Sequence, residues 1–128
     1  MAQVDLNSQG VNTNTTLITA VGSTTTKTSP TQTNVAGRGV VVVLKTTAIG
    51  TGSITLTVNG ISASGVSYLL ISGAAVTTNT TLVYTVYPGL TAAANVTANN
   101  VLPATWNVVV TANNANAATY TVDAGVVD

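Results

Sequence analysis

A continuous block of apolar, mostly β-branched residues, Val40-Val41-Val42-Val43-Leu44, follows Arg38-Gly39 and is the longest apolar run of the chain. Branched side chains fit the pleated surface of a sheet, and a short apolar run next to glycine suits a strand better than a helix. Because polar residues do not interrupt the block, it is typical of a strand buried on both faces. The sequence therefore predicts that residues 40–44 form the centre of the core.

Segments on both sides of this block alternate between apolar and polar residues, which is the pattern of a strand with one wet face. The expected strands are residues 17–21, 24–28, 40–44, 54–58, 66–71, 80–87, 105–111 and 120–122, the second of them an edge strand. Residues 90–100 are expected to form a loop with at most one helical turn. Many short strands joined by Gly, Asn and Pro turns predict an all-β fold, an antiparallel β-sandwich of the jelly-roll or Ig-like kind with seven to eight strands.

The first 16 residues are polar and contain only isolated apolar positions at Val4, Leu6 and Val11. They are expected to form an extended N-terminal arm, either as a disordered tail or as a segment that orders on a neighbouring subunit. Residues 17–128 are expected to form a single sandwich domain. The chain start lacks the pattern of a secretory signal, and no apolar run has the roughly 20 residues that span a membrane. We therefore expect a component made in the cytoplasm without a membrane partner.

Charge is scarce: six of the 128 residues are charged, and the chain has no His, Cys or Glu, whereas it has 26 Thr and 13 Asn. General acid and base catalysis draws on His, Glu, Asp, Lys, Cys or Tyr, and metal sites need His, Cys or clustered carboxylates. Binding to nucleic acids needs clustered Lys and Arg. The composition thus predicts a protein that is not an enzyme, with no cofactor, metal, small-molecule substrate or nucleic-acid partner.

The few residues that suggest chemistry have simpler interpretations. Lys45 lies at the end of the apolar block, where a lysine usually extends to water rather than acting as a base. Asp123 and Asp128 are too few for calcium, which takes six to eight oxygen ligands. Trp106 alternates with valines and is expected in the core. Tyr84 and Tyr87 are expected on opposite faces of their strand, so that one points outward and is available to a partner.

Several short stretches, in this order and spacing, resemble a family of small structural proteins of tailed bacteriophages, assigned as head decoration or cement proteins. The stretches are Pro30-Thr31-Gln32-Thr33-Asn34, Arg38-Gly39-Val40-Val41-Val42-Val43, Val86-Tyr87-Pro88-Gly89, Ala93-Ala94-Asn95, Leu102-Pro103-Ala104-Thr105-Trp106 and Ala118-Thr119-Tyr120-Thr121-Val122. The resemblance covers the chain from about residue 17 onward. Relatives often carry a basic residue after the Leu-Pro pair and after the Trp, where this chain has Ala104 and Asn107. Docking of that edge through charge is therefore not implied here.

The resemblance implies a β-sandwich on the outer surface of a phage capsid, a trimer that binds the major capsid protein, with no catalytic residues. A tail-tube or tail-tip protein, a bacterial surface adhesin module and a carbohydrate-binding sandwich are the alternatives. The candidate interface residues are Val4, Leu6, Val11, Arg38 and Tyr87. Contacts made by so neutral a surface are expected to depend little on salt.

Overall fold

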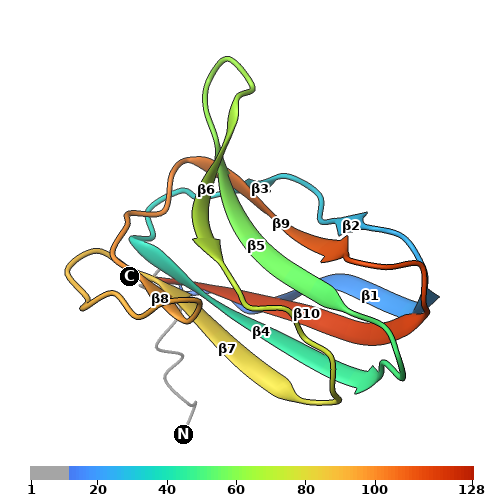
Figure 1. The fold of residues 1–128 in the computed structure, drawn as a ribbon. Coiled ribbons are helices and arrows are strands. Elements are labelled where there is room, and N and C mark those ends of the chain that lie inside the picture. The colour runs from blue at the N-terminus through green and yellow to red at the C-terminus, as the bar shows by residue number, and fades with distance from the viewer. Residues whose placement is uncertain (1–11) are drawn as a thin grey trace, which may run out of the picture.

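The computed structural model describes residues 12–128, which form ten β-strands in two sheets and contain no helix (Figure 1). The first sheet contains, in spatial order, β1 (Thr15–Ser23), β10 (Ala118–Val127), β4 (Gly39–Ala48), β7 (Thr81–Val86) and β8 (Thr97–Ala98). The second sheet contains, in order, β2 (Lys27–Thr28), β9 (Thr105–Ala112), β5 (Ile54–Ile61) and β6 (Ser67–Ser72), and β3 (Gln32–Thr33) also pairs with β9. All pairs are antiparallel except β7 with β8.

The strand pairs nest inside one another along the chain. β1 pairs with the last strand, β10, while β2 and β3 pair with β9. Further inside the sequence, β4 pairs with β7, and β5 pairs with β6 through a hairpin. Two more contacts, β10 with β4 and β9 with β5, join these pairs into the two sheets. The long strands are therefore held mainly by partners distant in the sequence.

The two sheets face each other around one apolar core (Figure 1). Every second residue of β5, β9 and β10 is buried, as their alternating sequences predict. The first sheet contributes Val42 and Leu44 to the core, and the second contributes Leu56, Val58 and the largest side chain, Trp106. The prediction that Trp106 points inward is confirmed, because only 2% of its surface is exposed.

The apolar block of β4 is buried on its inner face only. Val40, Val42 and Leu44 are fully buried, whereas Val41 and Val43 are half-buried on the outer face. Val43 lies opposite Val83 of β7, which is itself exposed. The prediction of burial on both faces is therefore wrong. A run of valines indicates an apolar strand, but it does not indicate whether another part of the protein covers the outer face of the sheet.

The predicted count of seven to eight strands is also wrong, since residues 12–128 contain ten. The two that were not expected, β3 and β8, have two residues each, and β8 lies in the segment expected to be a loop. The first strand begins at Thr15, and the backbone N–H of Thr13 already donates to the carbonyl oxygen of Val126 at 2.9 Å. Residues 1–11 of the expected arm lie outside the described residues.

Residues 12–128 include no helix that is long and apolar enough to cross a membrane.

Candidate binding surfaces

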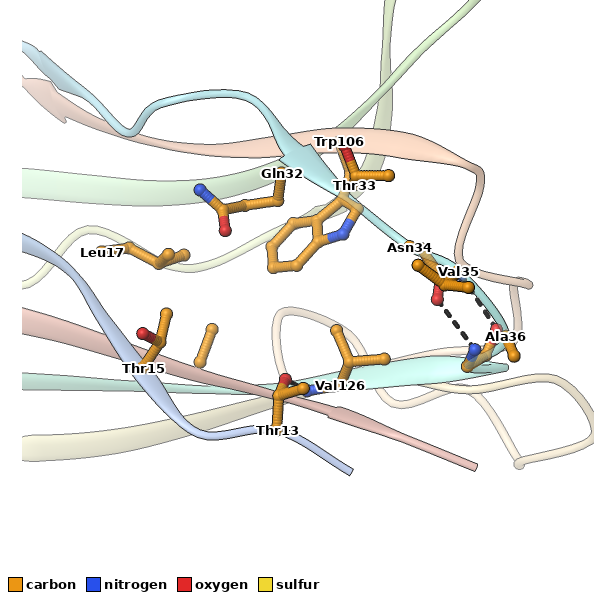
Figure 2. A pocket seen from close by; sticks show the side chains of 12 residues that line it. Thr13, Thr15, Leu17, Gln32, Thr33, Asn34, Val35, Ala36, Trp106 and Val126 are labelled. Atoms are coloured by element: carbon orange, nitrogen blue, oxygen red, sulfur yellow. Dashed lines mark hydrogen bonds between the residues drawn. The ribbon is translucent and has the colours of Figure 1, made fainter. Parts of the chain in front are cut away.

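An open cavity of about 500 Å³ lies between the two sheets, at the end where the chain enters β1 (Figure 2). Its lining comes from β1, β3, β9, β10 and the turn that follows β3. The lining residues are Thr13, Thr15, Leu17, Gln32, Thr33, Asn34, Val35, Ala36, Gly37, Trp106, Ala124 and Val126. This volume is within the range of roughly 300 to 1,000 Å³ that is typical of ligand sites.

The cavity floor is apolar because of the strand registers on both sides. In the second sheet Gln32 lies directly opposite Trp106, so the two side chains share the inner face. In the first sheet the register between β1 and β10 shifts between Thr16 and Ile18. The extra residue at this bulge is Leu17, which packs against the core and lines the cavity. Figure 2 shows Trp106 above the space and Val126 below it, with Leu17 beside the space at the level of the indole ring.

One asparagine holds the outer rim of the cavity in place. The side-chain amide of Asn34 donates to the carbonyl oxygens of Gly37 at 2.9 Å and Leu102 at 3.0 Å. Its side-chain oxygen accepts from the backbone N–H of Gly37 at 2.8 Å. These bonds join the two ends of the turn formed by residues 34–37, and they attach the turn to the segment before β9. The side chain of Asn34, bonded to the backbone at three points, therefore holds the rim.

The indole N–H of Trp106 is buried and has no hydrogen-bond partner among residues 12–128. A buried donor without an acceptor costs about 1 to 3 kcal/mol, so this N–H lowers the stability of the fold. The residues described as lining the cavity include no charged side chain. The cavity is therefore suited to a neutral, mostly apolar group, with threonine hydroxyls and the amide of Gln32 in its lining.

Four exposed apolar residues lie on segments that approach each other where β6 meets β8. We define the apolar edge as Leu69, Leu90, Val96 and Val101, which are all exposed. Three hydrogen bonds link this region: Thr85 N to Val96 O at 2.9 Å, Gly89 N to Asn99 Oδ1 at 2.7 Å, and Asn100 Nδ2 to Leu70 O at 3.3 Å. These bonds therefore cross-link the segments that carry the four exposed apolar residues.

Two of the five predicted interface residues, Arg38 and Tyr87, lie at the same end of the first sheet. Arg38 is exposed at the start of β4, and Tyr87 lies beside Gly39 at the same end of the first sheet. Tyr84 is buried, whereas Tyr87 is half-buried, and the Tyr87 hydroxyl donates to the backbone oxygen of Asp128 at 3.0 Å. Arg38 and Tyr87 thus mark one end of the molecule. The other three candidates, Val4, Leu6 and Val11, lie outside the described residues.

Lys45 and Asp123, which the sequence offered as a possible base and a possible calcium ligand, lie on outer surfaces. Lys45 is exposed on β4, between Thr81 and Thr121 of the neighbouring strands. A carboxylate oxygen of Asp123 accepts a hydrogen bond from the Thr16 hydroxyl at 2.7 Å. These two residues face water rather than the cavity.

Sequence reasoning missed both the cavity and the apolar edge. The run Tyr68-Leu69-Leu70-Ile71 does not alternate, and the register of β5 with β6 shifts between Val58 and Asn59. Leu70 and Ile71 are consequently both buried, while Leu69 is 58% exposed. The broken alternation was the available signal that one leucine faces outward. The cavity has no such signal, because it depends on how far apart the two sheets lie.

We compared the chain with known protein families, with curated proteins and with solved structures, and none of the three comparisons found a match.

Proposed function

We propose that this chain is a non-enzymatic structural protein of a tailed-phage particle, which decorates the outer capsid surface and stabilises it by binding the major capsid protein. The observation that carries the proposal is the apolar edge, which holds four of the nine large apolar side chains that are exposed in the described part of the chain. A rigid, uncharged surface of this kind is suited to contact with another protein through shape and apolar burial.

We further infer that the two sheets form a jelly-roll β-sandwich. A jelly roll is one long hairpin of eight strands, rolled up so that the first pairs with the last and each inner pair nests within. The pairs β1 with β10, β4 with β7, and β5 with β6 follow this order when β2 and β3 count as one interrupted strand and β8 as an addition. In an Ig-like fold the last two strands share a sheet, whereas β9 and β10 lie in different sheets.

The fold alone leaves the function open, because jelly rolls occur in viral capsid proteins and also in lectins and cupins. The side chains argue for an assembly role over a lectin-like one. Trp106 and Tyr84 are buried, so they offer no stacking face for a sugar, and Tyr68 is the only tyrosine classed as exposed in the described chain. Weak contacts repeated over many copies of a particle reinforce one another through multivalency. A homotrimer would multiply each contact in the same way.

The experiment that tests the proposal measures co-sedimentation with empty capsids of the phage that, on this proposal, encodes the chain. We expect the wild-type chain to bind, and the Leu69→Asp variant to bind roughly tenfold or more weakly. Binding to the capsid would bury this side chain, and burial of a charge is costly where burial of leucine is favourable. Thr111→Asp is the matched control, since Thr111 is exposed on β9 away from the apolar edge. It adds the same charge to the same sheet and should leave binding unchanged.

Two results would contradict the proposal, and a third would move the contact to another surface. Wild-type chain that stays in the supernatant at saturating concentration would exclude capsid decoration. Assembly of the isolated chain into rings or tubes would instead favour a tail component. Equal binding by the Leu69→Asp and Thr111→Asp variants would show that the apolar edge is not the contact, and deletion of the first 14 residues would then test the N-terminal segment as the alternative.

A further inference from the structure

We propose that the cavity between β1 and β3 receives the N-terminal segment, residues 1–11, of a second copy of this chain, with Val4 and Leu6 in contact with the apolar floor. The inference rests on the proposed function in one respect, the association of several copies, and names the site through which they associate. Capsid binding itself is not needed for it.

The sequence of the segment matches the lining of the cavity. Val4 and Leu6 are two residues apart, so in an extended conformation both side chains point to the same face, while Asp5 points to the other. The cavity floor of Leu17, Val126 and Trp106 is apolar, and no charged side chain is found among the described lining residues. The apolar face of the segment would thus enter the cavity and leave the carboxylate of Asp5 in water.

The backbone beside the cavity offers a place for an added strand. β1 is the edge of the first sheet, and in the part of the chain that the structure covers it pairs on one side only, with β10. An extended segment that adds to a free strand edge gains backbone hydrogen bonds, and its alternate side chains enter adjacent pockets.

The direction of the chain favours a second copy over the same molecule. The side-chain oxygen of Asn12 accepts from the backbone N–H of Asp128 at 2.9 Å, so the chain has already reached the end of β10. In Figure 2 the backbone at Thr13 runs past the cavity and away from Trp106. The segment that precedes Asn12 would have to reverse its direction to enter its own cavity, whereas the segment of a neighbour needs no reversal.

Disulfide trapping tests this inference in purified protein, without capsids. The chain contains no cysteine, so each engineered thiol is unique. Chains carrying Leu6→Cys are mixed with chains carrying Thr15→Cys, which lies on the cavity side of β1. A disulfide forms only where the two Cα atoms approach within about 4.4 to 6.8 Å. We expect a covalent mixed dimer on non-reducing gels, seen in neither chain alone.

Two matched controls test the face of each strand. Asp5→Cys replaces Leu6→Cys on the donor, because position 5 points away from the cavity in an extended segment. Thr19→Cys replaces Thr15→Cys on the acceptor, because Thr19 is exposed and lies opposite the outward-facing Thr121. Both control pairs should give roughly tenfold less mixed dimer. Equal yields from the controls, or no mixed dimer from correctly folded chains, would overturn the proposal.

A chain carrying both Leu6→Cys and Thr15→Cys separates the two possible sources of the segment. Predominantly internal disulfides that form at high dilution would show that each molecule fills its own cavity, and would likewise overturn the proposal. A synthetic peptide of residues 1–11 gives an independent measurement on a chain that lacks these residues, read through Trp106, the single tryptophan. Peptide carrying Leu6→Ser should bind roughly tenfold or more weakly than the native peptide. Equal affinities would contradict docking of Leu6.

Discussion

Two tyrosine hydroxyls are buried without a hydrogen-bond partner in the described part of the molecule, those of Tyr84 and Tyr120. Each has lost its contacts with water, and no protein group replaces them. Replacing Tyr84 or Tyr120 by Phe should therefore raise the free energy of unfolding by about 1 kcal/mol each. Urea unfolding followed by Trp106 fluorescence measures the change. Tyr87→Phe is the control, because that hydroxyl donates to Asp128, and it should leave stability equal or slightly reduced.

The same two residues predict how stability depends on pH. Burial raises the pKa of Tyr84 and of Tyr120 above the ordinary tyrosine value, because the charged phenolate is poorly solvated in the core. Their contribution to stability is fully present below the unfolded pKa of about 10 and is lost as pH rises through the higher folded values. The free energy of unfolding should therefore fall above about pH 10. A Tyr84→Phe, Tyr120→Phe double variant that lost stability as steeply would contradict this cause.

At the scale of the elements, the start of β4 depends on a close approach between strands. A Cβ at Gly39 would collide with the carbonyl oxygen of Val86 and lie 2.6 Å from Cδ2 of Tyr87. Gly39→Ala should thus lower the free energy of unfolding by about 1 to 3 kcal/mol. Gly65→Ala separates this steric cost from backbone strain, since a Cβ there meets no atom within 4 Å, but φ is +86°. Chemical unfolding of both variants measures the two costs, and an unchanged stability of Gly39→Ala would contradict the close approach.

The sequence predicted those elements whose residues alternate over several positions. β5, β9 and the Tyr84–Val86 part of β7 were all placed correctly, with the right residues inside, because one face of each is buried and the other is wet. β3 and β8 were not predicted, since two residues are too few for a period. Their pairing depends on where β9 and β7 lie in three dimensions, which is information that no local window contains.

The candidate sites were harder to predict than the strands. Trp106 was assigned to the core, and it is buried, but its neighbours Leu17 and Gln32 come from strands that are distant in sequence. The position of Leu17 in the cavity follows from a bulge in β1, and the outward position of Leu69 follows from a register shift in β6. A single extra residue in a ladder changes which face a side chain occupies, so alternation alone cannot give these positions.

At the scale of the whole molecule, the scarcity of charge predicts how the protein binds its partners. The chain has three cations and three anions, and Arg38 is the one cation among the candidate interface residues. Salt weakens contacts between exposed charges by screening them, whereas burial of apolar surface is not weakened by moderate NaCl. Binding to capsids and the trapping of mixed dimers should therefore change less than about threefold between roughly 0.05 M and 0.5 M NaCl.

Co-sedimentation across this range of salt measures the dependence, and Arg38→Gln provides the matched control. If Arg38 makes one exposed ion pair with the capsid, the wild-type chain should lose no more than about 0.6 kcal/mol of binding free energy in high salt, which is about threefold in affinity, and the variant should lose none. Leu69→Asp should weaken binding at every salt concentration, because its defect is the loss of apolar contact. At about 0.5 M NaCl the Debye length is only a few ångströms, so exposed charges are screened. Release of the wild-type chain at this salt concentration alone would show that charge holds the complex together.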